Sequence, residues 1–498
     1  IGTFESVPPG MNLPAEPPPA QGGPSEAPSF SIGRYRPIYL WAGPGTIRMN
    51  RLKFMGQPVD EAAHREAHLP LGAQRVVEGI YSNWVHLTYN WGFPPEVEAE
   101  DWADFARAAQ VYHAAGAKVF AYIQSSNCVF DGSYRVKDWY VLNPQGKKIF
   151  YYSGRYMTCL ANPEWTAHLK EMIRGALERG ADGIFLDNLW HGAMPDTLFA
   201  TWLGGAGCHC ARCRAAYHSA ANEAIPREIR PGDGRTKRYL RWRADQVTRL
   251  VSEMQDWVEE PRPGTPLSAN DYDFFLRDTY LVFGQDLEGL SRVQDVVMIE
   301  NHALPRLDLT HPQHPRLVNN ALVLRSARRL VDPKAHLSVL SYDQGIGFEG
   351  LYPPRRYQLA IAEAAACGAS MTVKGTEYFE GGQHTLLTPA EFAPLQAVIG
   401  GCQRWLEAHA DLFQGGQNCA EVGLLFPGER LWLDWMRLAR LYQGAGQVLT
   451  WAGIPWRVVK TADLWGAAGD GLRVLLTFGD GLPEANIPSG LTVVDVPG

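Results

Sequence analysis

Residues 181–190 read Ala-Asp-Gly-Ile-Phe-Leu-Asp-Asn-Leu-Trp, and this stretch decides the fold class. Gly180 stands just before it and lets a preceding helix end in the left-handed conformation. Gly183–Asp187 is an apolar run of strand length that stops at a carboxylate. Asp187 could alternatively cap a following helix, but the residues after it continue as a loop. The stretch therefore predicts a buried strand that carries an aspartate to the edge of a sheet.

Strand-like and helix-like segments alternate on both sides of this stretch, which indicates repeated βα units and a parallel sheet. The eight candidate strands are Ile38–Trp41, Trp84–Tyr89, Lys118–Ile123, Gly183–Asp187, Pro266–Asn270, Val296–Ile299, Leu337–Tyr342 and Ser370–Val373. The candidate helices include Trp102–Ala114, Pro163–Arg179, Thr236–Trp257, Arg356–Ala366 and Pro389–Ala408. Eight such units favour a closed (β/α)8 barrel, the TIM barrel, over an open sheet.

The two ends of the chain differ from its middle in amino-acid composition and in sequence pattern. Residues 1–31 include a Pro-rich stretch that we expect to form an extended, disordered leader. We assign residues 32–414 to the barrel and residues 415–498 to a second α/β unit, whose strands alternate with a helix. This unit has no phosphate-binding glycine motif, so we expect it to be structural or to form oligomers.

Composition argues against several classes of partner. A hydrophobic content of 46% and a charged content of 20% are typical of a globular protein. The net charge of −7 speaks against nucleic acid or an anionic membrane, and we see no run of the roughly 20 apolar residues that a membrane span requires. The 16 Trp and 20 Tyr leave aromatic rings available to stack on sugar faces. We therefore expect an oligo- or polysaccharide partner and no organic cofactor.

The leader leaves the location of the protein open between two accounts. The chain starts at Ile1 rather than Met, as it would after removal of a signal peptide or lipid anchor from an exported protein. The alternative is a natural disordered leader on a chain that is not exported. We favour an extracellular or periplasmic location over a cytoplasmic one.

Asp187 and Glu300 are the candidate catalytic pair. At the end of the fourth strand, Asp187 could attack an anomeric carbon or stabilise its positive charge. Glu300 follows four apolar residues at the end of the sixth strand, where partial burial would raise its pKa toward that of a general acid. The alternative for Glu300 is a simple ion pair with an arginine. The distance between the two carboxyls would separate retaining from inverting chemistry.

Other polar and aromatic residues at predicted strand ends suit the binding of a pyranose, by stacking and by hydrogen bonds to its hydroxyls. The expected substrate-binding residues are Trp41, Tyr89, Asn90, Trp91, Tyr122, Gln124, Asn188, Trp190, His191, Asn270, Asp271, His302, Tyr342, Asp343, Lys374 and Glu377, with Tyr272 and Asp273 beside them. Lys374 is also open to a different reading, as the base of another kind of hydrolase or lyase. Any single one of these residues could instead belong to the core.

Cys208, Cys210 and Cys213 form the second chemical cluster. Three thiolates so close together need one more ligand to complete a tetrahedral zinc site, and Cys128, Cys159 and His209 are the candidates. The alternative is a set of reduced, buried cysteines without metal. A closed four-ligand site would be structural and would brace loops rather than catalyse.

The motifs from Arg155 to Tyr217 resemble those of family-42 β-galactosidases. The resemblance lies in Arg-Tyr-Met-Thr-Cys-Leu-Ala-Asn-Pro-Glu-Trp at 155–165, the Asp187-Asn188 strand end, and the Cys-x-Cys-x-x-Cys triplet. It implies a barrel followed by a flavodoxin-like domain that assembles oligomers. It also implies that Cys159, which precedes an Asn-Pro step, is the fourth zinc ligand.

The chain departs from that family at one position of the predicted site. Family-42 enzymes carry Asn-Glu at the end of strand four, with Glu as acid/base, whereas this chain has Asn188-Leu189. An Asp on strand four with an acid on strand six looks like the arrangement in α-galactosidases and α-fucosidases, where that Asp is the nucleophile. We therefore expect a retaining glycoside hydrolase with Asp187 as nucleophile and Glu300 as acid/base. The alternative is a carbohydrate-binding barrel that has lost its activity.

Overall fold

The computed structural model describes most of the chain and places the predicted barrel within it. The described residues are 30–40, 72–90, 92, 95–126, 129–130, 138–150, 155–192, 207–230, 232–275, 278–301, 306–308, 316–318, 320–341, 354–374, 376–379, 382–385, 393–416, 418–465, 471–479 and 487–497. Nearly all of the predicted leader, residues 1–29, lies outside these ranges. No helix among the described residues is long and apolar enough to span a bilayer.

Eight parallel strands close into a barrel, which confirms the predicted fold class. In order around the barrel they are β1 (Pro37–Leu40), β12 (Ser370–Lys374), β11 (His336–Ser341), β8 (Val296–Asn301), β7 (Leu267–Tyr272), β6 (Gly183–Asp187), β3 (Lys118–Gln124) and β2 (Trp84–Asn90). The register is regular apart from a β-bulge between Thr88 and Asn90 of β2; for example, Gln124 pairs with Asp187 and Tyr272 pairs with Glu300. Chain order and spatial order agree, so the carboxyl ends of all eight strands meet at one mouth.

Alternation along each strand separates the inside of the barrel from its outer layer. Tyr39, Phe120, Phe185 and Met298 belong to one buried cluster that fills the barrel. Their neighbours, such as Ile184 and Val297, belong to a larger cluster that includes residues of the surrounding helices. Because successive side chains of a strand point to opposite faces, this division fixes which residues reach the mouth.

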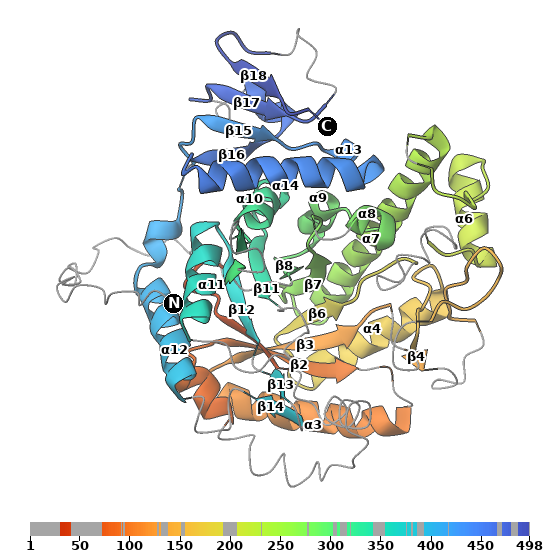
Figure 1. Ribbon diagram of the computed structural model, residues 1–498. Helices are drawn as coiled ribbons and strands as arrows, with labels where there is room; N and C mark the ends of the chain where they lie inside the picture. The colour runs from red at the N-terminus through yellow and green to blue at the C-terminus, as the bar shows by residue number, and fades with distance from the viewer. Residues whose placement is uncertain are drawn as a thin grey trace, which may run out of the picture.

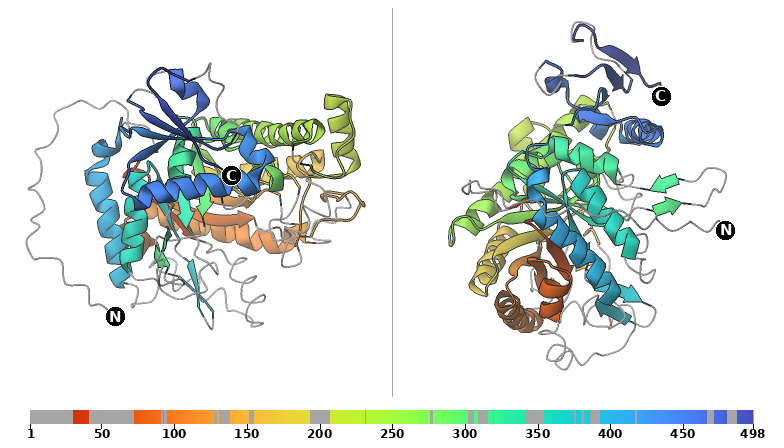
Figure 2. Two further views of the ribbon diagram at one scale, coloured as in Figure 1. Left: turned by 45° about the horizontal axis from the view of Figure 1, so that its top comes forward. Right: turned by 90° about the vertical axis from the view of Figure 1, so that its left-hand side faces the viewer.

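Helices surround the barrel, as the right-hand view of Figure 2 shows. The principal ones are α3 (Pro95–Ala114), α4 (Pro163–Glu178), α7 (Gly234–Glu259), α10 (Ala321–Leu330), α11 (Pro354–Ala366) and α12 (Ala393–Ala408). Helix α4 begins where Asn162 accepts hydrogen bonds from the N–H groups of Glu164 and Trp165, with Pro163 as the first helical residue. Asp233 caps α7 in the same way.

Three small hairpins leave the barrel after its third, sixth and eighth strands. They are β4–β5 (Val129–Phe130 and Arg155–Tyr156), β9–β10 (Arg306–Asp308 and Arg316–Val318) and β13–β14 (Thr376–Phe379 and Gly382–Thr385). Short helices α6 (Ala211–Ala221), α8 (Thr279–Val282) and α9 (Leu287–Leu290) occupy the loops after β6 and β7. The hairpins and α6 follow strand ends and so add structure on the mouth side of the barrel, whereas α8 and α9 form the connection that returns from β7 to the start of β8.

The C-terminal α/β unit forms a four-stranded parallel sheet. Its order is β16 (Trp456–Val459), β15 (Val422–Leu425), β17 (Val474–Thr477) and β18 (Thr492–Asp495), so the second strand lies outside the first. This is the beginning of the flavodoxin-like order. The helical segment after β15 is divided into α13 (Glu429–Leu433) and α14 (Trp435–Trp451) at Asp434, whose ψ of 47° leaves the helical region.

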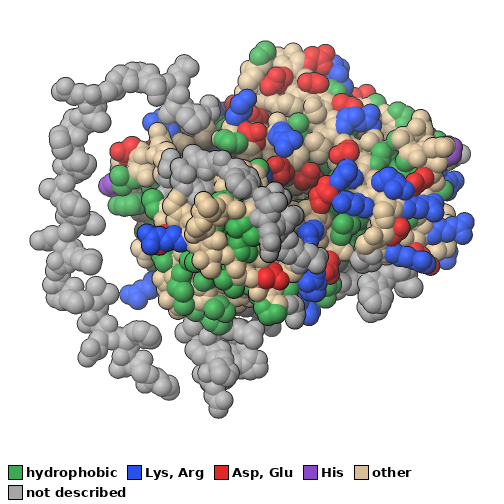
Figure 3. Space-filling model, turned by 90° about the horizontal axis from the view of Figure 1, so that it is seen from above, with side chains coloured by type: hydrophobic (Ala, Val, Ile, Leu, Met, Phe, Trp, Pro, Cys, Tyr) green, Lys and Arg blue, Asp and Glu red, His purple; other side chains and the backbone are tan. Residues whose placement is uncertain are grey.

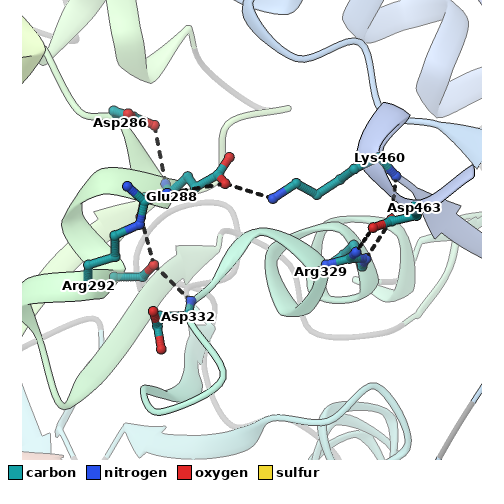
Figure 4. Close-up of polar contacts among 8 residues, drawn as sticks. Asp286, Glu288, Arg292, Arg329, Asp332, Lys460 and Asp463 are labelled. Atoms are coloured by element: carbon teal, nitrogen blue, oxygen red, sulfur yellow. Dashed lines mark hydrogen bonds and ion pairs between the residues drawn. The ribbon is translucent and has the colours of Figure 1, made fainter. Parts of the chain in front are cut away.

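The C-terminal sheet and its helix pack on the barrel helices rather than standing apart (Figure 1). Phe275 stacks on Tyr442 at 5.2 Å and Tyr280 stacks on Trp432 at 5.4 Å. Ion pairs flank this apolar contact: Lys460 lies 2.7 Å from Glu288, and Arg329 contacts Asp463 (Figure 4).

Candidate functional site

Asp187 lies at the mouth of the barrel and is only 4% exposed. It ends β6 on the same side of the strand as Phe185, so its carboxylate stands above the barrel core. Tyr122 and Asn188 donate to Oδ2, and Asn270 donates to Oδ1 at 2.9 Å. Such donors stabilise the ionised form of a carboxylate. These three donors therefore fix the orientation of the Asp187 carboxylate.

Asn270 joins the two predicted catalytic carboxylates. Its Nδ2 donates to Asp187 Oδ1 at 2.9 Å and to Glu300 Oε2 at 2.5 Å. The two oxygens can be no farther apart than these hydrogen bonds laid end to end, about 5.4 Å. Retaining glycosidases hold their carboxyl groups roughly 5–5.5 Å apart, whereas inverting enzymes need roughly 6.5 Å or more. These two oxygens are thus too close for the inverting arrangement, and their separation is compatible with the retaining one.

Asn188 orients Asp187 and is itself held on several sides. Its φ of 51° is a left-handed conformation that asparagine tolerates better than most residues. Its Nδ2 donates to Gln124 Oε1 at 3.2 Å as well as to Asp187, and its Oδ1 accepts from the Tyr272 hydroxyl at 2.7 Å. Ser126 Oγ donates to the Asn188 carbonyl. The Asn188 amide therefore serves to position the carboxylate rather than standing free for a ligand.

Gln285 and Ser126 are site residues that the sequence analysis did not identify. Gln285 is 2% exposed, and its Nε2 donates to the carbonyls of Leu189 at 3.2 Å and Asn270 at 3.1 Å. It thereby ties the end of β6 to the end of β7. Ser126 follows Gln124 closely and could have been found by extending the third strand. Gln285 lies between two short helices, where no pattern points to it.

Four predicted binding residues gather around Asp187, and several others lie elsewhere. Tyr122, Gln124, Asn188 and Asn270 form the hydrogen-bonded group described above, together with Tyr272. Trp190 stacks on Phe283 at 4.7 Å within the core. Asn90 is buried and accepts the N–H of Gly92 at 2.8 Å. Trp190 is therefore part of the packed core, and Asn90 stabilises the turn after β2.

Tyr89 and Asp271 point away from the mouth, which corrects their assignment as substrate-binding residues. Tyr89 stacks on Trp102 at 5.8 Å and accepts from Arg179 at 3.1 Å, so it lies between β2 and the helix layer. Asp271 follows Asn270 in β7 and therefore faces the opposite side of the strand. It is 2% exposed, and burial raises the pKa of its carboxyl to about 8 while Gln294 opposes that shift.

The remaining predicted site residues are not described with side chains. Trp41, Trp91, His302, Tyr342 and Asp343 lie outside the described residues. Lys374 ends β12 and Glu377 lies in β13, and only their backbone is described. Asp273, which we placed beside the expected substrate-binding residues, accepts a hydrogen bond from the N–H of Phe275 at 2.8 Å.

Four cysteine sulfurs form the second site, and all lie within 4.8 Å of one another. The cysteines are Cys159, Cys208, Cys210 and Cys213, all buried. Cys159 Sγ lies 3.8 Å from Cys210 Sγ and 3.5 Å from Cys213 Sγ. A tetrahedral zinc with bonds of about 2.3 Å requires sulfurs about 3.8 Å apart. Of the candidate fourth ligands, Cys159 is thus the one that the fold brings to the triplet, while Cys128 lies outside the described residues.

The donor set fits zinc on chemical grounds as well. Hydrogen bonds from the neighbouring thiols lower the pKa of Cys210, and the same contacts raise the pKa values of Cys159 and Cys213. Without a metal the group therefore shares its protons, and a bound cation would allow all four sulfurs to ionise and coordinate it. His191 lies against this group, with Nε2 3.5 Å from Cys213 Sγ, so it belongs to the cysteine site and not to the sugar site. His209 is buried but is not one of the four clustered ligands.

A closed parallel barrel with two carboxylates at its mouth is the architecture in which glycoside hydrolases work. Solved structures of this class share the fold. The β-galactosidase from Rahnella sp. R3 is 14% identical, with 91% of this chain and 68% of that chain covered at a TM-score of 0.59. A GH42 β-galactosidase from G. stearothermophilus is 14% identical, with 89% and 67% covered at 0.58. An exo-carrageenase of the same family from Bacteroides ovatus is 10% identical, with 93% and 68% covered at 0.55.

The chain therefore has the fold of family-42 β-galactosidases, as its sequence motifs predict. The likeness extends through the barrel and into the C-terminal unit, since about nine tenths of the chain is covered. No protein-family model matches the sequence, and no curated protein matches it either. At these identities the likeness establishes the fold, and the chemistry has to be argued from the site.

Proposed function

We propose that the protein is a glycoside hydrolase that retains anomeric configuration, with Asp187 as nucleophile and Glu300 as acid/base. The observation that carries this proposal is the Asn270 bridge, which sets the two carboxylate oxygens no more than about 5.4 Å apart at the barrel mouth. The pair stands where catalytic groups of such barrels occur, at the ends of strands four and six.

The proposed reaction proceeds by two displacements. Asp187 attacks the anomeric carbon while the protonated Glu300 gives its proton to the departing glycosidic oxygen, so that a glycosyl ester forms on Asp187. Glu300, now a carboxylate, takes a proton from water as that water attacks the same carbon. The sugar leaves, and Asp187 is regenerated as a carboxylate.

Hydrogen-bond donors around Asp187 favour its part in this reaction. Tyr122, Asn188 and Asn270 stabilise the anion before attack and after hydrolysis, and they fix which lone pair faces the ligand. Glu300 is half-buried, whereas Asp187 is almost fully buried. The more exposed partner can exchange its proton with water, as an acid/base must.

A non-catalytic carbohydrate-binding barrel is the second candidate. Its support is Leu189, which stands where family-42 enzymes are expected to carry the glutamate acid/base. Leu189 is fully buried, so it offers the ligand no replacement group. Under this alternative Asp187 and Glu300 would bind sugar hydroxyls without cleaving a bond.

Aryl glycosides test the proposal directly. We expect turnover of at least one α- or β-glycoside, with β-galactosides in the panel because structural neighbours are β-galactosidases. Asp187→Asn and Glu300→Gln should each lower kcat by about 1,000-fold or more. Asp271→Asn is the matched control, because that carboxyl neighbours Asn270 but faces the helices, and its kcat should stay near wild type. Equal turnover by wild type and Asp187→Asn would refute the assignment.

Stereochemistry and rescue distinguish the retaining route from its rivals. NMR of the first product should show the anomer of the substrate. Azide should restore turnover to Asp187→Gly by replacing the missing nucleophile. Binding of a sugar without turnover by any variant or the wild type would instead support the carbohydrate-binding alternative.

We propose three further properties of the protein. The cysteine group binds one structural zinc ion, the C-terminal unit from about residue 415 contributes to self-association, and the chain acts outside the cytoplasm. Metal analysis, light scattering and cell fractionation of the native protein test these in turn.

A further inference from the structure

The segment 207–241 is strongly basic in a chain that is acidic as a whole. It contains seven arginines and one lysine against three carboxylates, while the whole chain carries a net charge of −7. The segment comprises α6, the start of α7 and the loop between them. Overall net charge, which argued against nucleic acid and an anionic membrane, therefore hides a local excess of positive charge.

Nearby carboxylates do not neutralise this excess. Glu223 pairs with both Arg235 and Arg238, so one negative charge serves two positive ones. Glu429 of α13 is likewise shared, between Lys237 and Arg241. In contrast, Arg212 has its own partner in Asp138 and Arg230 has its own in Glu228.

Arg214 and Arg227 add two charges without a carboxylate partner among the described residues. Both are exposed, and both act electrostatically on the ring of the buried His209. Arg214 Nη1 donates to the His209 carbonyl at 2.5 Å, which anchors the side chain to the turn before α6. We call Arg214, Arg227, Arg235, Lys237, Arg238 and Arg241 together the basic face.

The basic face lies at the rim of the barrel mouth. Helix α7 runs antiparallel to the strands that it covers, so its first turns, with Arg235 to Arg241, stand on the side where the strands end. Helix α6 begins at the cysteine group, whose Cys213 contacts His191, four residues beyond Asp187. Figure 1 shows α6 and the adjacent end of α7 projecting beyond the barrel, and Figure 3 shows Lys and Arg side chains gathered along that edge.

We propose that the basic face binds anionic polysaccharide and holds a charged chain beside the mouth of the barrel. The shared chemistry of the ligand is a sugar chain with repeated sulfate or carboxylate groups. Five of the six cations are arginines, whose planar guanidinium groups bind such oxyanions through paired hydrogen bonds. The unbalanced charges lie on α6, on α7 and in the loop between them, so consecutive anionic groups of one chain can be bound together.

Charge favours a polysaccharide over nucleic acid or a membrane. The segment 207–241 lies at one rim, and the rest of the sequence has more acidic than basic residues, which disfavours an extended polyanionic surface. A single flexible sugar chain touches only the rim and the mouth. Because binding requires none of the catalytic chemistry proposed above, it can be measured in Asp187→Asn, and its failure is separable from failure of the hydrolase proposal.

Fluorescence anisotropy with labelled oligosaccharides tests the basic face. The probes are a sulfated galactan, a polygalacturonate and a neutral galactan of equal length, each titrated with the full chain in its Asp187→Asn form. We expect binding of at least one anionic probe, weakened as salt rises. The double variant Arg235→Glu with Arg238→Glu should weaken it by about tenfold or more. A comparison of the affinities for the sulfated galactan and the polygalacturonate shows whether sulfate or carboxylate groups are preferred.

Matched controls keep the result decisive. Arg473→Glu reverses an arginine of similar exposure in the C-terminal unit and should leave binding unchanged. Arg214→Gln with Arg227→Gln removes two charges without reversing any and should weaken binding even if the first variant folds poorly. The proposal is overturned if neither charge variant weakens binding, if the neutral galactan binds equally well, or if duplex DNA or anionic lipid vesicles bind as tightly as both anionic sugars.

Discussion

At the scale of single residues, the site depends on which side of a strand each side chain faces. The sequence placed each barrel strand end within two residues of its observed position and predicted Tyr122, Gln124, Asn188 and Asn270 at the mouth, where they do gather. It treated every polar residue near a strand end alike, although a shift of one residue turns a side chain to the other face. Asp271 shows the consequence, because it neighbours Asn270 and yet faces the helices.

Substitutions of Asn270 should show whether its amide joins Asp187 to Glu300 or only fills space in the barrel. Asn270→Ala removes the donor shared by Asp187 and Glu300, so we expect kcat to fall about 100-fold with a small change in Tm. Asn270→Asp keeps the shape but places a third carboxylate between two others, so its activity should be lower still near neutral pH. Steady-state kinetics of both variants measure this order. An Asp variant as active as the wild type would rule out the bridge.

Asp271 should make stability fall as pH rises. Its pKa is raised from 3.8 in the unfolded chain to about 8 in the fold by burial. Between these values the unfolded chain has released a proton that the folded chain still holds, so rising pH favours unfolding by up to about 1.4 kcal/mol per pH unit. Above about pH 8 both states are ionised, and this effect stops growing.

Urea unfolding at pH 5, 6.5 and 8 measures the effect of Asp271. Asp271→Asn cannot ionise, so its stability relative to the wild type should rise by about 2–4 kcal/mol from pH 5 to pH 8. Glu171→Gln, at an exposed position on α4, is the control and should show no such trend. Parallel pH profiles for wild type and Asp271→Asn would contradict the burial argument.

At the scale of elements, periodicity was sufficient for regular segments and insufficient for the loops. The observed bounds of β6 are those predicted, and α4 differs only at its last residue, because Gly180 and the Asn162 cap mark their ends locally. The β4–β5, β9–β10 and β13–β14 hairpins were missed, since strands of two to four residues carry too short a pattern. The cysteine group joins two such loop regions, and its fourth ligand came from the family resemblance rather than from spacing.

Removal of one cysteine should release the metal and loosen these loops. We expect about one zinc ion per chain in the wild type and much less in Cys213→Ser, because four thiolates complete the site. The variant should also have a lower Tm, since the group braces the segments around Cys159 and α6. Cys367→Ser changes a buried cysteine outside the group and should keep the metal. Metal-free wild type, or Cys213→Ser that keeps its metal, would contradict the assignment.

At the scale of the whole molecule, the C-terminal unit belongs to the same hydrophobic core as the barrel. One buried cluster includes Phe275 of the barrel side together with Tyr442 and Trp456 of the C-terminal unit. The pair between Lys460 and Glu288 joins partly exposed groups and is worth at most about 1 kcal/mol. Asp463 is 8% exposed and accepts two hydrogen bonds from Arg329, so that pair adds to the attachment. The apolar contact therefore outweighs the pair between Lys460 and Glu288 in attaching the unit.

Calorimetry of two interface variants tests this balance. Phe275 is 5% exposed and stacks on Tyr442, so Phe275→Ala should cost about 3–5 kcal/mol and lower Tm by several degrees. Glu288→Gln weakens the pair with Lys460 drawn in Figure 4 and should cost less than about 1 kcal/mol. Because the core is continuous, the wild type should unfold in one transition. Two separate transitions in the wild type, or a larger cost for Glu288→Gln than for Phe275→Ala, would mean that charges rather than packing attach the C-terminal unit to the barrel.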